Sequence, residues 1–546
     1  MSTSPAEYQH YIPQFLLRNF SHPFHCPEAE GGSRKKGRKC KCKHEKGKYP
    51  NDPVLNCVNL TSTPIHHEVR PVKRVFGLAN MYDDKTKPTT AEQQRIEKKF
   101  SKMESHASTI FRRMVKAQEG GEEGIILTRI ERDLVRKFLF LLKYRGRGFH
   151  NRFYHASVDE YCANDRAIML EYMRAKGFKT PLDVWFHNLE AIMDIDMGPG
   201  IGWMFDLCEK MFPPDARWFF MHAQAYYMVI CTPSDGDEEF VLTDNCFNVF
   251  EGPNTFARDK RTGEIIPSSH AGFHEFAPIS PRLMIIIRSS TLPNPLEDAD
   301  PEVRKRRDDE RWSAFGQVYG PMRESLFADL PVFKAKTSYV QIINGGYYPV
   351  AGFDGKFRPN DTFTFNFFRI EHCHIQNMNN ILLDNTYSCT TIAFRSHAAF
   401  FKTLESYISG PCDSGKVIGG NEAGLRLKFL RKLEALARNM GSTKPLSYTF
   451  MEEVPTIDGE AYMRRHEEFQ YLGLSADEGG KGSDTVFGFL KLYASIGDAP
   501  PLSLLFAVVT TDELTNQQRA WISRRPFRPF KQISLSQAAC YILRSW

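Results

Sequence analysis

The sequence lacks long hydrophobic runs and is poor in cysteine. Its apolar runs, such as residues 138–142 and 283–287, are far shorter than the ~20 residues that a membrane-spanning helix needs. The first residues lack the charged-then-apolar pattern of a secretory signal. The 12 cysteines are few and scattered for 546 residues, which favours reduced thiols over a disulfide framework. We therefore expect an intracellular protein, cytoplasmic or nuclear, that does not bind membranes.

Complete catalytic and phosphate-binding motifs are also absent. Residues 419–424 have the first glycine spacing of a Walker A loop, but Leu425-Arg426 follows instead of Lys and Ser or Thr. His274-Glu275 lacks the second histidine four residues on, which excludes the His-Glu-x-x-His zinc peptidases. The sequence has no Gly-x-Ser-x-Gly nucleophile elbow. These motifs therefore identify no reaction class, and the cofactor, if any, is left open.

Positive charge is concentrated in one segment. Residues 34–48 contain nine Lys or Arg and one Glu, and subtracting this local +8 from the total of +6 leaves about −2 for the rest. The surrounding stretch, from about residue 23 to 53, has no apolar period and predicts a mobile basic loop. Such a loop suits the phosphates of nucleic acid or another polyanion, and it equally suits a nuclear address.

The cations that we expect to bind an acidic partner all lie in this loop: Arg34, Lys35, Lys36, Arg38, Lys39, Lys41 and Lys43. Cys26, Cys40, Cys42 and His44 lie among them, and thiolates and imidazole are zinc ligands. Cys40 and Cys42 are separated by only one residue, and the neighbouring lysines would repel a cation. We therefore prefer a solvated basic loop to a zinc site.

Hydrophobic and aromatic residues make up 42% and 13% of the chain, which predicts a large core, and the length predicts more than one lobe. Capping boxes that begin at Thr90, Thr128 and Ser157 each precede an apolar helical period, as does Thr180-Pro181. These signals predict an α-helical lobe over about residues 90–215.

Strand-like segments rich in aromatic and β-branched residues follow at 218–232, 240–243, 283–287 and 385–394. Residues 293–311 are charged and contain proline, which favours a linker or an exposed insertion. The predicted fold class is α+β, with the helical lobe packed on a small, mainly antiparallel sheet over about residues 216–410. Residues 1–410 would form the core and 411–546 a helical C-terminal extension.

The opening run, His10 to Phe20, combines a titratable group with a helix start. Pro13 suits the first position of a helix, and Leu16, Leu17 and Phe20 share one helical face. His10 then lies near the positive end of that helix, where a neutral imidazole suits a metal ligand or a general base. The alternative is an imidazole that hydrogen-bonds a nearby carbonyl and docks the N-terminus.

Asp244 and Asn245 directly follow a predicted strand, where a carboxylate can serve as a base or a metal ligand. The alternative is an Asx-turn, in which these side chains bond their own backbone. We slightly favour the turn.

Three segments together resemble DUF4238, a family described only as a domain of unknown function. The opening run resembles its His-aromatic-aliphatic-Pro pattern, residues 240–245 its strand ending in an Asp-Asn turn, and residues 276–287 its Pro-containing strand entry. Residues 385–396 are similar to its closing segment, whereas Cys246 replaces the proline that usually follows Asp-Asn. The resemblance spans about residues 9–410 and favours a fungal-type member, but it implies no reaction.

Two functional hypotheses follow. The first is an intracellular protein that binds nucleic acid or another acidic partner through residues 34–48. The second is a metal-dependent hydrolase, a phosphodiesterase or nuclease, with His10 and Asp244 as ligand or base. The oligomeric state is left open.

Overall fold

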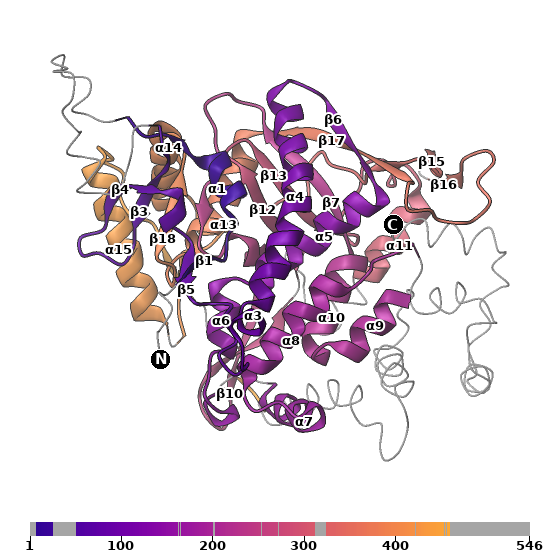
Figure 1. Ribbon diagram of the computed structural model, residues 1–546. Helices are drawn as coiled ribbons and strands as arrows, with labels where there is room; N and C mark the ends of the chain where they lie inside the picture. The colour runs from indigo at the N-terminus through magenta and orange to yellow at the C-terminus, as the bar shows by residue number, and fades with distance from the viewer. Residues whose placement is uncertain are drawn as a thin grey trace, which may run out of the picture.

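The computed structural model describes most of the first 458 residues. The described residues are 7–25, 51–161, 163, 165–199, 202–252, 254–270, 272–311, 324–344, 346–420, 422–451, 454 and 456–458. The basic residues 34–48, with Cys40, Cys42 and His44, lie outside this set, as does Cys26 and most of the expected C-terminal extension. The α+β fold class is confirmed, because a helical lobe packs beside mainly antiparallel sheets (Figure 1).

The predicted helical lobe is present. Its elements are α3 (Thr90–Gln93), α4 (Arg95–Glu119), α5 (Arg129–Tyr144), α6 (Arg147–Phe153), the 3-10 turn η3 (Val158–Glu160), α7 (Arg166–Lys176), α8 (Pro181–Asp194), α9 (Gly202–Lys210) and α10 (Pro213–Gln224). In the described chain none of the helices is long and apolar enough to cross a membrane.

The capping boxes mark three of these helix starts. Thr128 and Glu131 cap α5, and Thr180 and Asp183 cap α8 with Pro181 in its first turn. The first box begins at Thr89 rather than Thr90, with Glu92 as its partner. Ser157 caps only η3, so the third predicted helix begins later, at α7.

A seven-stranded sheet forms the centre of the molecule. Its strands are β6 (Gly124–Thr128), β7 (Tyr226–Pro233), β9 (Phe250–Glu251), β12 (His274–Ser280), β13 (Leu283–Ser289), β14 (Lys336–Thr337) and β17 (Thr362–Ile370). The order is β14-β17-β7-β13-β12-β9, with β6 also paired to β17, and only β17 and β7 are parallel. All seven residues of β13 are buried, so this strand lies in the core.

The expected strand over 218–232 is wrong in its first half. Residues up to Gln224 belong to α10, and the strand starts at Tyr226. Ala216, Phe219, Phe220 and Ala223 recur at helical spacing and are all buried. Burial of this face outweighs the strand preference of the aromatic side chains.

A second sheet carries the N-terminal segment. It consists of β2 (His22–Pro23), β3 (Pro53–Asn59), β4 (His66–Pro71), β8 (Leu242–Thr243) and β18 (Thr391–Phe394), in the order β2-β3-β18-β8 with β4 on the other edge of β3. Around it lie α1 (Gln14–Phe20), the 3-10 turn η2 (Val72–Arg74), α13 (His372–Asp384), α14 (His397–Ser409) and α15 (Ala423–Asn439) (Figure 1). The sheet content is thus larger than expected and divided in two.

Short pairs complete the described fold. They are β1 (Tyr8–His10) with β5 (Gly77–Ala79), β10 (Asn254–Asp259) with β11 (Ile265–His270) and β21 (Thr456–Ile457), β15 (Val340–Ile343) with β16 (Gly346–Pro349), and β19 (Val417–Ile418) with β20 (Thr449–Phe450). A single 3-10 turn, η4 (Cys246–Asn248), follows the Asp-Asn pair.

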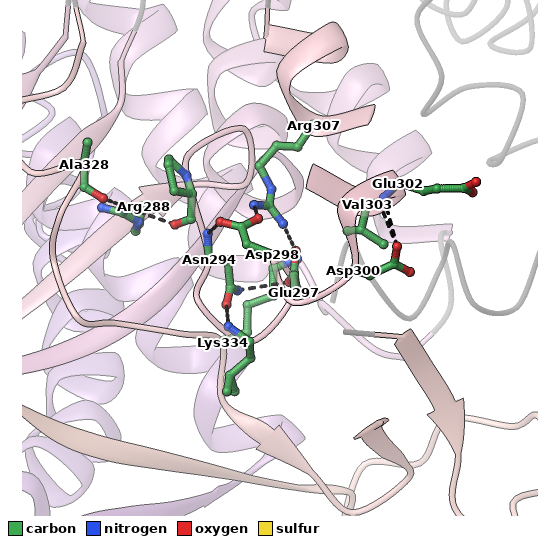
Figure 2. A network of polar contacts seen from close by, with 12 residues as sticks. Arg288, Asn294, Glu297, Asp298, Asp300, Glu302, Val303, Arg307, Ala328 and Lys334 are labelled. Carbon is green, nitrogen blue, oxygen red and sulfur yellow. Dashed lines mark hydrogen bonds and ion pairs between the residues drawn. The ribbon is translucent and has the colours of Figure 1, made fainter. Parts of the chain in front are cut away.

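Residues 293–311 do not form a linker. They contain α11 (Pro301–Arg311), which a buried ion-pair network ties to the body of the protein (Figure 2). The Arg307 guanidinium lies 2.6 Å from the Glu297 carboxylate and also contacts Asp298. Lys334 Nζ lies 3.1 Å from Glu297, which holds the pKa of that carboxyl below its usual value despite its burial. The buried charges of this network, those of Arg307, Glu297 and Lys334, are tolerated in the interior because each has a partner of opposite charge.

Replacing Glu297 with alanine should destabilise the protein by about 3–5 kcal/mol, because Arg307 and Lys334 would stay buried without their shared anion. Urea unfolding of the variant measures the loss. The matched control is Asp309→Ala on the same helix, which removes an exposed partner of Lys305 and should leave the unfolding midpoint unchanged. Equal midpoints for the two variants would contradict the network's role.

Candidate functional site

His10 is the last residue of β1, and its imidazole bonds a carbonyl. His10 Nε2 lies 3.3 Å from the Val72 carbonyl oxygen, to which it donates. Burial lowers the pKa of His10, and the nearby Arg145 guanidinium lowers it further. Pro13 lies just before α1, as its N-cap. This geometry matches the docking alternative, although a role of His10 in chemistry stays an untested prediction.

Asp244 is buried at the end of β8 and accepts bonds from a distant segment. Its carboxylate accepts from the Thr390 amide at 2.9 Å, the Thr390 hydroxyl at 2.6 Å and the Thr391 amide at 3.0 Å. Burial raises the pKa of Asp244, while the Thr390 bonds and Arg147 oppose that rise. The carboxylate therefore fixes the start of β18. Its hydrogen bonds go to Thr390 and Thr391, which are distant in sequence, and not to its own backbone as in the expected Asx-turn.

Asn245 supports the same turn. Its amide nitrogen donates to the Asn385 carbonyl at 2.8 Å, and its side-chain oxygen accepts from the Thr243 hydroxyl at 3.1 Å. Both members of the Asp-Asn pair thus link β8 to the segment between α13 and β18.

Two tyrosines of the opening segment, rather than His10, are electrostatically coupled to Asp244. The Asp244 carboxylate adds to the rise of the pKa of Tyr11 and of Tyr8, which burial causes first. Arg147 Nη1 lies 3.8 Å from Asp244 and is the partly exposed member of this group. In the described contacts no hydrogen bond or ion pair joins His10 to Asp244. The signal for the tyrosines was present in the sequence, since both flank His10.

Strand pairing joins the residues on either side of the connection that contains the basic segment. His22 pairs with Val54 and Pro23 with Pro53, so β2 and β3 form a hairpin stem. Beyond it, the Phe24 amide donates to the Asp52 carbonyl at 2.9 Å and the Asn51 amide to the Phe24 carbonyl at 3.1 Å. The described residues therefore fix where the basic segment leaves the sheet and where it returns.

His274, Glu251 and Ser325 form a buried cluster that is not a hydrolytic triad. His274 Nδ1 lies 2.9 Å from Glu251, and Ser325 Oγ donates to the same carboxylate at 3.0 Å. The other ring nitrogen accepts from Arg288 at 2.5 Å. In a catalytic triad the serine and the acid occupy opposite ring nitrogens. Here both lie on the Nδ1 side of His274, so the cluster is a structural hydrogen-bond network.

Lys143, Glu275 and His222 form a second buried polar network. Glu275 accepts from Lys143 Nζ at 2.5 Å and from His222 Nδ1 at 2.9 Å, and these partners lower its pKa to about 2 against the effect of burial. Lys143 also lies 4.4 Å from the Trp218 ring centre. Among the described residues, no group of three or more His, Cys, Asp or Glu is arranged to hold a metal ion.

Removing the Asp244 carboxylate should destabilise the protein by about 2 kcal/mol, because two backbone amides and a hydroxyl lose their acceptor. Asp244→Asn keeps one acceptor oxygen and should cost less than Asp244→Ala in thermal or urea unfolding. Asp206→Ala, which removes an exposed carboxylate near Lys210, is the matched control. A stable Asp244→Ala variant would argue against the anchoring role.

Buried histidines should make the protein sensitive to mild acid. The pKa values of His150 and His274 are lowered to about 4, mainly by burial. The unfolded chain takes up these protons near pH ~6.5, so stability is full above that value and falls as the pH drops toward ~4. Each group should cost on the order of 1–2 kcal/mol at pH ~5 in urea titrations.

The pH slope has a matched test. His274→Asn should flatten the dependence between pH ~6.5 and ~4.5, whereas substitution of the exposed His106 should not change it. An unchanged slope in His274→Asn would show that this imidazole is not the source. Glu275, whose pKa is lowered to about 2 in the folded protein, loses its contribution to stability only as the pH falls below ~4.5.

Comparison with known proteins extends the sequence resemblance. The family model described as "Protein of unknown function (DUF4238)" matches residues 8–398. No curated protein and no solved structure matches the chain. The matched region begins at β1 and ends at the start of α14, so it contains His10, Asp244 and both main sheets. Because the match covers well over half of the sequence, the chain belongs to the DUF4238 family.

Proposed function

We propose that the protein binds nucleic acid or a chemically similar polyanion through the basic segment 34–48. The observation that carries the proposal is the charge of this segment, nine Lys or Arg against one Glu, in a chain that is otherwise slightly acidic. Phosphate recognition is driven by such local cation density, because binding releases counterions from the polyanion. The expected contacts are those of Arg34, Lys35, Lys36, Arg38, Lys39, Lys41 and Lys43.

The hairpin stem supports the proposal by its position. Since β2 and β3 pair at Val54 and Pro53, the connection that contains the basic segment starts and ends at one edge of the second sheet. The segment is therefore internal to the chain, and the strands on both sides of it are anchored in the folded body. An intracellular protein with such a segment would meet nucleic acid in either the cytoplasm or the nucleus.

The second hypothesis, a metal-dependent hydrolase at His10 and Asp244, receives no support from the contacts. Both carboxylate oxygens of Asp244 already accept from Thr390 and Thr391, and His10 Nε2 donates to Val72. In the described contacts no hydrogen bond or ion pair joins the two residues, and among the described residues no group of three or more His, Cys, Asp or Glu is arranged to hold a metal ion. We therefore rank polyanion binding first.

Neutralising the basic segment should abolish most polyanion binding. Replacing the seven expected contact residues with glutamine should weaken binding of a fluorescent oligonucleotide at low salt, as measured by anisotropy. The plot of log affinity against log salt should flatten by about 0.7 for each lost phosphate contact on a single strand.

A control on another surface separates this segment from a general loss of positive charge. Lys98→Gln, Lys102→Gln and Arg112→Gln remove exposed cations from α4 and should change affinity little. If the seven-residue variant binds as tightly as the wild type, with the same salt slope, the proposal fails.

A further inference from the structure

An exposed aromatic ring lies at the start of β1. Tyr8 is 40% exposed, and its ring meets the His10 ring edge-on with centroids 5.2 Å apart. The Tyr8 hydroxyl accepts from the Gly77 amide at 3.0 Å. A Cβ on Gly77 would lie 2.6 Å from the Tyr8 ring, so only glycine lets the ring rest there. The ring is therefore held in place before any ligand arrives.

Exposed cations lie on the elements next to β1. Arg18 is in the last turn of α1, Lys73 and Arg74 lie in η2, and all three are exposed. Arg70 of β4 reaches over η2, where its Nη2 donates to the Arg74 carbonyl at 2.7 Å. The elements meet, because α1 packs on η2 and His10 bonds Val72. We name these residues the β1–η2 face: Tyr8, His10, Arg18, Arg70, Lys73 and Arg74.

Charged groups of both signs act on the two rings of this face. The Arg70 guanidinium lowers the pKa of Tyr8 and Asp244 raises it, while Arg18 lowers the pKa of His10 and Glu104 raises it. Glu68 lies 3.9 Å from Arg70. Neither Arg18 nor Arg74 has an ion-pair partner in the part of the chain that the structure describes. The face therefore keeps a positive excess.

One acidic side chain near β1, that of Asp83, lies on the other side of the strand. Side chains alternate along a strand, so Tyr8 and His10 share one face of β1 and Gln9 points to the opposite one. There the buried Gln9 amide donates to Asp83 at 2.8 Å. The strand thus separates Asp83 from the cations of the β1–η2 face.

The face adjoins both ends of the basic segment. Arg18 lies just before β2, which starts at His22, and η2 follows Pro71, which pairs with Val54 at the start of β3. In Figure 1, α1, β1, β3 and β4 lie together on one side of the molecule. The face therefore lies beside the two strands between which the basic segment is inserted.

We propose that the β1–η2 face is a binding platform for single-stranded nucleic acid, with Tyr8 stacking on a base and Arg18, Arg70 and Arg74 contacting phosphates. This inference rests on the proposed polyanion binding and adds its ligand class. An exposed ring among cations fits a strand whose bases are unpaired, because every base offers a π-face. A duplex hides those faces, and an anion without bases gains nothing from the ring.

The test separates ring recognition from charge. Wild type, Tyr8→Phe and Tyr8→Leu are titrated with a fluorescent single-stranded oligonucleotide of about 20 nucleotides and, in competition, with inorganic polyphosphate. Both substitutions remove the bond to Gly77, but only leucine removes the ring. We expect Tyr8→Leu to weaken oligonucleotide binding about tenfold, Tyr8→Phe to stay close to wild type, and polyphosphate binding to be unaffected by either.

The cations are tested with the full-length chain as well. Arg18→Gln, Arg70→Gln and Arg74→Gln combined should weaken the oligonucleotide and flatten the salt slope by about 2, unlike the α4 control set. Wild-type affinity and slope in this variant, or an equal loss of polyphosphate and oligonucleotide in Tyr8→Leu, would overturn the platform. If only the seven-residue variant of segment 34–48 loses binding, the proposed function stands without the platform. If only the face variants lose it, the platform stands and the role of the segment fails.

Discussion

Helix α5 carries buried cations along its whole length, and three of them bond an anion or a carbonyl on another element. Arg129 lies 2.9 Å from Asp361 before β17, and Arg136 donates to the carbonyl of Tyr226, the first residue of β7. Lys143 bonds Glu275 of β12, as described above. An unpaired charge in a core is far more costly than the pair is favourable, so these contacts act as constraints on assembly. They allow α5 to dock on the seven-stranded sheet in one register only.

The same constraint reaches the N-terminal segment through Arg145. This fully buried residue follows α5, lies 2.6 Å from Glu104 of α4, and donates to the His10 carbonyl. The side-chain oxygen of Gln9 accepts a further hydrogen bond from the Tyr82 amide. The first strand is therefore attached by buried polar groups as well as by the apolar face of α1. These bonds fix the backbone of β1, and with it Tyr8 and His10, to the body of the protein.

Local signals in the sequence predicted the starts of α5 and α8, because a capping box needs only residues three apart. Long-range partners could not be predicted in this way: Asp244 is anchored by Thr390, 146 residues later. Helix α13 escaped notice because its buried residues include His374, Gln376, Asn379 and Asn380, which hide the apolar period. The opening segment forms the predicted helix after Pro13. For His10 the geometry matches the structural alternative, in which the imidazole bonds a carbonyl.

The distribution of charge follows from these anchors. Inside the protein, cations such as Lys143, Arg129 and Arg307 are matched by carboxylates, so buried pairs contribute little to the net charge. Segment 34–48 carries a local +8, which alone exceeds the net +6 of the chain. Salt screens exposed charges over about 10 Å but affects buried pairs much less. Ionic strength should therefore act on the proposed polyanion binding and leave the buried pairs intact.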